Sequence, residues 1–253
     1  MFEIISYTDS FSTSWMLQKT SDVFKQPVTF VGLNNKKIKP MEYYPKIQAY
    51  VDALKNSKAT HVFIVDAFDT ILLKTPSVPV YLKNKVVVSS GCSSWPKCYD
   101  KLLHKTPDFV QCMYLKLPQC YPNSGNIYGP REQLLSLFQN MSVKREEMNE
   151  YIQKVDDQAS IMHVIHDVPD IVIDYNSTVF VNLYECHGKT PRQFRGRTTC
   201  FQYPWDPMSH VSVRDGSVFY KYSSVASIPS FAHASGRGYS KLRSILRQMK
   251  LMH

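Results

Sequence analysis

The sequence predicts an α/β fold in which a mixed central β-sheet is flanked by helices, with residues 1–253 forming a single domain. In the first half, short apolar segments alternate with helical patterns, which is typical of a largely parallel sheet covered on both faces. The second half contains more expected strands than helices, which indicates that antiparallel strands join the sheet. No internal repeat and no low-complexity linker divides the chain.

The expected strands are short apolar runs bounded by turn residues. The clearest covers residues 61–68, in which four consecutive apolar residues, 62–65, form the continuous run expected of a strand buried on both faces. The other expected strands cover residues 2–7, 28–33, 85–89, 170–175, 179–184, 217–222 and 230–234.

Four helices are expected between and after these strands. Residues 44–54 carry apolar side chains at helical spacing. A second helix begins at Pro130, since proline suits the first helical position. A third begins at Asp156 and Asp157, whose charges are favourable at a helix N-terminus, and a basic helix at residues 241–251 follows the last strand.

The net charge of +9 favours anionic partners in general. The basic clusters at residues 34–39 and 237–253 do not interleave aromatic residues as nucleic-acid-binding motifs do, so nucleic acid is not an expected partner. Neither a GxGxxG fingerprint nor a GxxxxGK[ST] phosphate loop is present, which excludes those two nucleotide sites.

The chain shows no signal-peptide pattern and no apolar run long enough to cross a bilayer, so a cytoplasmic location is expected, including that of a virus-infected host cell. The six cysteines include no CxxC pair, which argues against a structural zinc site. Four of them lie between residues 92 and 120, where disulfides would form in an oxidising compartment.

The strongest local motif is a D-x-x-D pair that ends the apolar strand at residues 61–68. Asp66 and Asp69 follow the continuous apolar run directly. Ligands of open α/β sheets gather at the carboxyl ends of strands, and paired carboxylates there suit a hard cation that also contacts phosphate. Both side chains reach one ion if the chain turns directly after Asp66. The pair therefore predicts a divalent-metal site.

Two other interpretations of this pair remain open. In the first, Asp69 caps a turn and Asp66 pairs with a buried cation. In the second, the motif belongs to a haloacid-dehalogenase-like phosphatase, whose strand ends in D-x-D-x-[TV]. The spacing here, D-x-x-D-T, is one residue longer than that pattern.

Six segments, in the same order, resemble the glycosyltransferase domain of the procollagen lysyl hydroxylase family. The D-x-x-D stretch at residues 65–72 resembles the metal-binding motif of that domain. The remaining segments are Ser-Trp-Pro at 94–96, Asn-Ser-Gly within 121–129, Asp-Asp-Gln at 156–158, the Ile-Asp and Val-Phe-Val-Asn-Leu stretch at 173–183, and Pro-Ser-Phe-Ala-His-Ala-Ser-Gly at 229–236 followed by Lys-Leu at 241–242. Together they span nearly the whole chain.

The resemblance implies a GT-A-like, Rossmann-type fold, a Mn²⁺ ion and a UDP-sugar donor. Asp66, Asp69 and His233 take its metal-ligand positions. Asp156 and Asp157 fall on acidic residues that the family needs for transfer, so both are catalytic candidates. The residues expected to contact the donor, apart from Asp66, are Phe68 against the uracil, Lys241 at the diphosphate, Ser124 and Gly236.

These features predict a metal-dependent hexosyltransferase that moves glucose or galactose from UDP-glucose or UDP-galactose to a hydroxyl on a protein or glycan. The cation and a nearby lysine would stabilise the charge that develops on the UDP leaving group. A carboxylate such as Asp157 would accept the proton of the acceptor hydroxyl. The alternative is a catalytically inactive GT-A module that binds a nucleotide or a partner.

Overall fold

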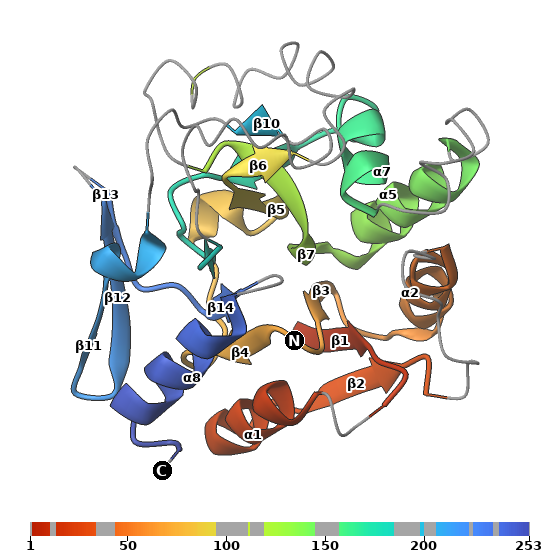
Figure 1. The fold of residues 1–253 in the computed structure, drawn as a ribbon. Helices are drawn as coiled ribbons and strands as arrows, with labels where there is room; N and C mark the ends of the chain where they lie inside the picture. The colour runs from red at the N-terminus through yellow and green to blue at the C-terminus, as the bar shows by residue number, and fades with distance from the viewer. Residues whose placement is uncertain are drawn as a thin grey trace.

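A computed structural model describes residues 2–10, 14–33, 44–94, 111, 119–144, 157–184, 198–199, 206–222, 225–234 and 238–252. Its main element is a six-stranded sheet with strand order β2-β1-β3-β7-β5-β8 (Figure 1). The strands are β1 (Phe2–Tyr7), β2 (Val28–Val31), β3 (His61–Asp66), β5 (Val86–Gly91), β7 (Tyr121–Pro130) and β8 (Ile171–Asp174). β7 runs antiparallel to β3 and β5, whereas the β1–β2, β1–β3 and β5–β8 pairs are parallel. The expected mixed sheet flanked by helices is therefore confirmed.

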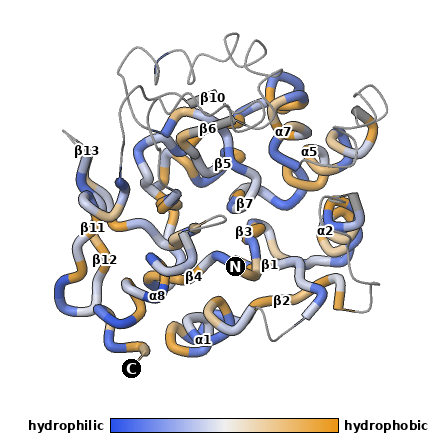
Figure 2. The backbone as a smooth tube through the Cα atoms, in the orientation of Figure 1, coloured by the Kyte–Doolittle hydropathy of each residue, from blue (hydrophilic) through white to orange (hydrophobic). Residues whose placement is uncertain are grey.

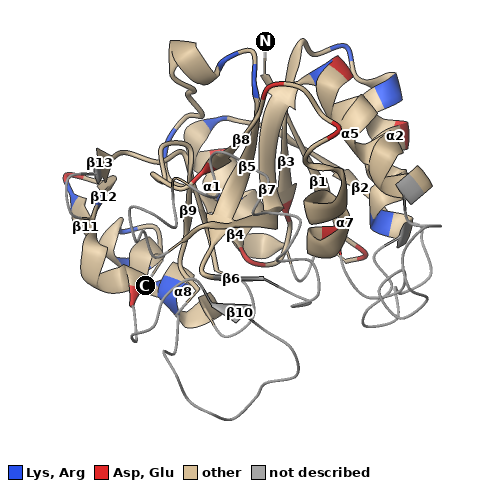
Figure 3. Cartoon of the chain, turned by 90° about the horizontal axis from the view of Figure 1, so that it is seen from above, with Lys and Arg blue, Asp and Glu red and all other residues tan. Residues whose placement is uncertain are grey.

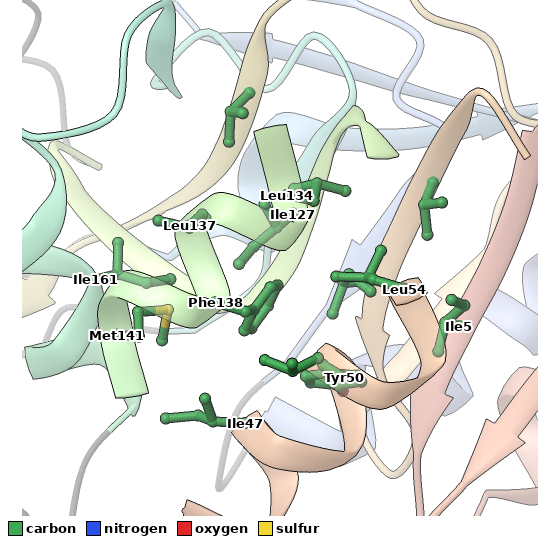
Figure 4. Close-up of a cluster of buried hydrophobic side chains, with 14 of the residues drawn as sticks. Ile5, Ile47, Tyr50, Leu54, Ile127, Leu134, Leu137, Phe138, Met141 and Ile161 are labelled. Atoms are coloured by element: carbon green, nitrogen blue, oxygen red, sulfur yellow. The ribbon is translucent and has the colours of Figure 1, made fainter. Parts of the chain in front are cut away.

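One face of this sheet is covered by three helices, α2 (Tyr44–Asn56), α5 (Arg131–Lys144) and α7 (Asp157–Val164). Figure 4 shows Tyr50 and Leu54 of α2 and Phe138 of α5 in one cluster with Ile127 of β7. Tyr50 and Leu54 are almost fully buried. The apolar spacing at residues 44–54 therefore corresponds to the helix face that packs on the sheet.

The opposite face is covered by α1 (Trp15–Phe24) and a three-stranded sheet with the order β4-β14-β9. β4 covers Thr70–Leu72, β14 Phe231–His233 and β9 Phe180–Asn182. Apolar segments lie along β2 and β4 in Figure 2. Successive residues of β3 alternate between the two cores: Val62 packs in the helical layer, whereas Phe63 packs towards the three-stranded sheet. Burial on both faces explains why residues 62–65 are all apolar.

The C-terminal third of the described chain adds a further layer beside the three-stranded sheet. It contains the antiparallel strands β11 (Val211–Arg214), β12 (Ser217–Tyr222) and β13 (Val225–Ser227) and the helix α8 (Tyr239–Gln248). The described residues also form four short elements: η1 (Val80–Leu82), β6 (Ser93–Ser94), β10 (Thr198–Thr199) and η4 (Pro207–His210). Lys and Arg occur on several separate elements, α2 and α8 among them (Figure 3).

Several expected boundaries were wrong for identifiable reasons. The strand expected at 61–68 ends at Asp66 because the chain turns and begins β4 at Thr70. Pro130 is the last residue of β7 and α5 begins at Arg131. α1, β4 and β7 were not expected; β7 contains prolines and glycines, which usually argue against a strand interior.

Cys92 and Cys120 are both disulfide-bonded. Disulfides persist mainly in oxidising compartments. The expected cytoplasmic location therefore remains a prediction that gains no support from these residues. Among the described residues, no helix is both long and apolar enough to span a bilayer.

The turn between β8 and β9 is held by a buried carboxylate. Asp174 accepts backbone hydrogen bonds from Thr178 (2.8 Å), Val179 (2.7 Å) and Phe180 (2.9 Å). Burial raises the pKa of Asp174, while the three N–H groups act in the opposite direction. One side chain thus satisfies three donors that would otherwise have no partner.

Replacing Asp174 with alanine should lower the free energy of unfolding by about 3 kcal/mol, because three buried N–H groups would lose their acceptor. Chemical denaturation followed by circular dichroism measures the change. Asp167→Ala, at an exposed aspartate nearby, is the control and should change stability by less than about 0.5 kcal/mol. Equal effects of the two substitutions would show that the Asp174 hydrogen bonds do not stabilise the turn.

Candidate metal centre

Two strand pairings bring Asp66, Asp69 and His233 together. Asp66 is the last residue of β3, and Asp69 lies in the turn before β4. β14 runs antiparallel to β4 with His233 opposite Thr70, and the N–H of Ala234 donates to the carbonyl of Asp69 (2.8 Å). The strand that carries His233 therefore lies beside the turn that follows Asp66 and pairs with β4.

One ligand atom from each of the three residues lies within 4.8 Å of the others. Ligands of a shared ion are separated by up to roughly twice the metal–ligand bond length, which is about 2.0–2.6 Å for such ligands. The donor set of two carboxylates and one imidazole suits a divalent cation such as Mn²⁺. The three residues therefore fit a metal ion.

The His233 imidazole is almost fully buried, yet neither ring nitrogen has a hydrogen-bond partner among the described residues. Its Nε2 lies 3.3 Å from Asp69 Oδ1 and 3.7 Å from Asp66 Oδ2 without the geometry of a hydrogen bond. A buried imidazole nitrogen that faces two carboxylates at these distances is the arrangement expected of a metal ligand.

The same contacts determine the charge states of His233 and Asp69. Burial alone would lower the pKa of His233, but the carboxylates of Asp69 and Asp66 outweigh it and raise this pKa to about 10. Burial would raise the pKa of Asp69, and the charge of His233 reverses this and lowers it. Without a metal ion, His233 is therefore protonated at neutral pH.

The Asn-Ser-Gly segment forms a bulge in β7 that supports His233. Val88 of β5 pairs with Ile127, but the next residue, Ser89, pairs with Asn123, so residues 124–126 are extra in β7. A β-carbon on Gly125, within this bulge, would overlap Cε1 and Nε2 of His233. Only glycine allows this close approach, which gives the Asn-Ser-Gly sequence its structural reason.

Lys46 is a site residue that was not identified from the sequence. It lies in the first turn of α2, and its buried ammonium donates to Asp66 Oδ1 (2.6 Å) and to Asp157 Oδ2 (2.7 Å). Burial alone would lower the pKa of Lys46, but Asp157 and Asp66 raise it well above the ordinary value. Lys46 therefore remains charged and connects the metal cluster to Asp157.

One sequence signal was available for Lys46. A cation in the first turn of a helix is unfavourable because the positive end of the helix dipole lies there. A lysine in the first turn of the expected 44–54 helix therefore indicated nearby acids. Of the first open interpretation, the part in which Asp66 pairs with a buried cation is confirmed, and this pairing coexists with the metal-ligand geometry.

The charges of the assembled site balance when it contains a divalent ion. The carboxylates of Asp66, Asp69 and Asp157, the ammonium of Lys46 and one divalent cation sum to zero if His233 is neutral. Buried charge is stable when it is paired in this way. The electrostatics therefore agree with the ligand geometry.

The remaining expected site residues are placed as follows. Phe68, between the two metal-site aspartates, keeps 39% of its surface exposed. Ser124 belongs to the β7 bulge. The ammonium of Lys241 pairs with Asp206 (2.9 Å). Lys241 would therefore have to release or share Asp206 in order to contact a diphosphate. Asp156 and Gly236 lie outside the described residues.

No protein-family model and no curated protein matches the chain. Many solved structures resemble it, among them two that match over nearly their full length. One is a glycosyltransferase involved in glycosylation of the major capsid of PBCV-1 (9% identity, 99% of each chain, TM-score 0.45). The other is the galactosyltransferase LgtC in complex with donor and acceptor sugar analogs (10% identity, 100% of this chain and 96% of that chain, TM-score 0.46). At these values the likeness concerns the arrangement of elements, and the functional argument rests on the residues of the site.

Gly125→Ala should weaken Mn²⁺ binding by about tenfold to 100-fold, the range for disturbing the support of a metal ligand, because the new methyl group displaces the His233 ring. Isothermal titration calorimetry measures the affinity. Gly91→Ala is the matched control, since its β-carbon would be 3.7 Å from the nearest atoms, an ordinary contact. Unchanged affinity in a folded Gly125→Ala protein would contradict the role of the bulge.

Affinity for Mn²⁺ should rise with pH, by up to about tenfold per pH unit, throughout the neutral and mildly alkaline range below the His233 pKa of about 10. The reason is that protonated imidazole must release its proton before it binds a metal ion. Titrations at several pH values, each in two buffers of different ionisation enthalpy, measure both the affinity and the released proton. A His233→Asn protein should bind more weakly and lose this dependence. A pH-independent affinity in the unmodified protein would exclude His233 as a ligand.

Proposed function

We propose that this protein is a metal-dependent glycosyltransferase that moves a hexose from UDP-glucose or UDP-galactose to a hydroxyl group of a protein or glycan. The observation that carries the proposal is the convergence of Asp66, Asp69 and His233 at strand ends, with Asp157 joined to them through Lys46. The six sequence segments that resemble a glycosyltransferase domain point to the same chemistry.

In this proposal, Asp66, Asp69 and His233 hold Mn²⁺. When bound, the ion stabilises the negative charge of the diphosphate leaving group. Phe68 is partly exposed beside the cluster and offers a surface against which the uracil ring packs. The buried amide nitrogen of Asn126 has no hydrogen-bond partner among the described residues, and it remains available to an oxygen of the donor.

The transfer forms a bond between the acceptor oxygen and the anomeric carbon and breaks the bond from that carbon to the β-phosphate. UDP leaves with the bonding electrons. Asp157 accepts the proton of the acceptor hydroxyl, and Lys46 fixes the orientation of this carboxylate relative to Asp66. Asp156, the preceding residue in the sequence, is the second catalytic candidate.

UDP should raise the melting temperature only when Mn²⁺ is present, and GDP and CMP should not. Asp69→Asn should abolish both this shift and the release of UDP from UDP-glucose or UDP-galactose. Asp157→Asn should keep the shift and lower turnover by about 100-fold or more, because the amide keeps the shape but cannot accept a proton. Thermal-shift and UDP-release assays measure these effects.

Asp52→Asn, at an exposed position of α2, serves as the control and should behave as the unmodified protein does. Metal-dependent UDP binding without turnover in the unmodified protein would indicate an inactive binding module. A phosphoenzyme that forms without nucleotide would indicate the haloacid-dehalogenase-like phosphatase instead. UDP release by Asp69→Asn at the normal rate would contradict the metal assignment.

A further inference from the structure

A cavity of about 700 Å³ lies at the end of the three-stranded sheet opposite the metal cluster. Its lining includes Lys74, which follows β4, and Ile228, which precedes β14. Thr70 is opposite His233 at the other end of the same strands, and the four residue steps from Thr70 to Lys74 correspond to about 13 Å of extended chain. The cavity is therefore separate from the metal cluster, and its volume suits a small ligand.

The walls of the cavity are held by hydrogen bonds within the fold. The hydroxyl of Ser230 accepts from the N–H of Ser77 (3.1 Å) and donates to its carbonyl (3.2 Å). Ser227 Oγ donates to the carbonyl of Ser177 (2.7 Å), and the Asp174 carboxylate holds the N–H of Thr178. A cavity whose walls are already ordered loses little entropy when a ligand binds.

The charge of the lining points to an anionic ligand. Lys74 is its one charged residue among those described, and no carboxylate accompanies it. The ammonium of Lys74 has neither an ion pair nor a hydrogen bond with the described part of the chain. Burial lowers the pKa of Lys74, and a bound anion would offset that effect. A single cation favours one negative group, whereas a nucleic acid or polyphosphate site requires several cations.

The other lining groups favour a sugar. Tyr81 is 68% exposed and presents a flat aromatic surface, which matches the apolar C–H face of a sugar ring. The amide of Asn176 both donates and accepts hydrogen bonds, as sugar hydroxyls require. The hydroxyl oxygens of Thr178 and Ser227, whose protons are used within the fold, accept them.

A peptide is less suited to the same walls. Extended peptides bind mainly through backbone groups of an open strand edge. Here the N–H and carbonyl of Ser77, the carbonyl of Ser177 and the N–H of Thr178 are already bonded within the fold. A ligand in this cavity would therefore be recognised by the side chains that line it.

We propose that this cavity binds an acidic sugar unit of a glycan, with Lys74 pairing with its carboxylate and Tyr81 packing on its ring. The site would hold a uronate-containing glycan at a distance from the metal cluster. Binding requires neither Mn²⁺ nor a nucleotide, so this inference does not depend on the proposed sugar transfer.

The test uses trigalacturonate as the probe and its methyl ester as the matched neutral sugar, both in metal-free buffer. Protein made in bacteria leaves Asn176, which begins an Asn-Ser-Thr sequence, without a glycan. Calorimetry and saturation-transfer NMR should show that trigalacturonate binds about tenfold more tightly than its ester. Lys74→Met should weaken binding by about tenfold, and Tyr81→Ala by about threefold to tenfold.

Lys83→Met is the matched control, because it removes an exposed lysine near Tyr81 that does not line the cavity. Lys74→Arg keeps the charge and should retain binding, which separates loss of charge from loss of fold. Asp69→Asn should bind trigalacturonate normally. Equal binding of the ester, of triglutamate or of inorganic phosphate would overturn the proposal, as would unchanged binding by folded Lys74→Met.

Discussion

The contact on which the rest of the site depends is the double ion pair of Lys46 with Asp66 and Asp157. It joins the first turn of α2, the end of β3 and the start of α7. Removing one member of such a buried network costs about 3–5 kcal/mol, because the remaining charges lose their partner. Lys46 therefore fixes the helical layer against the sheet and, at the same place, fixes the orientation of the Asp66 and Asp157 carboxylates.

The sequence was sufficient for those features that a short segment encodes. The apolar run at 62–65 predicted the buried strand, and the two aspartates after it predicted a metal site at its end. His233 was included only through the resemblance to a known domain, because no local pattern links it to residues far earlier in the chain. Lys46 and the bulge of β7 were missed, since each has meaning only through contacts between distant segments.

The three-stranded sheet β4-β14-β9 gives the molecule two chemically different ends. At one end, Asp69 and His233 present negative charge and an imidazole to a cation. At the other, Lys74 presents a single positive charge among hydroxyl and amide groups. Because opposite charges lie at opposite ends of a short rigid sheet, a cation and an acidic sugar would not compete for one place.

The pairing of β14 with β4 also bears on the order of folding. During synthesis, the strand that carries His233 emerges long after the aspartates that it faces, and it must enter between β4 and β9 to complete the small sheet. Closing so long a loop is slow and comes late in folding. Full coordination of a cation is therefore available only to a chain whose C-terminal strands are already inserted. Acquisition of the ion would mark the last stage of maturation and would give a direct signal for it in a refolding experiment.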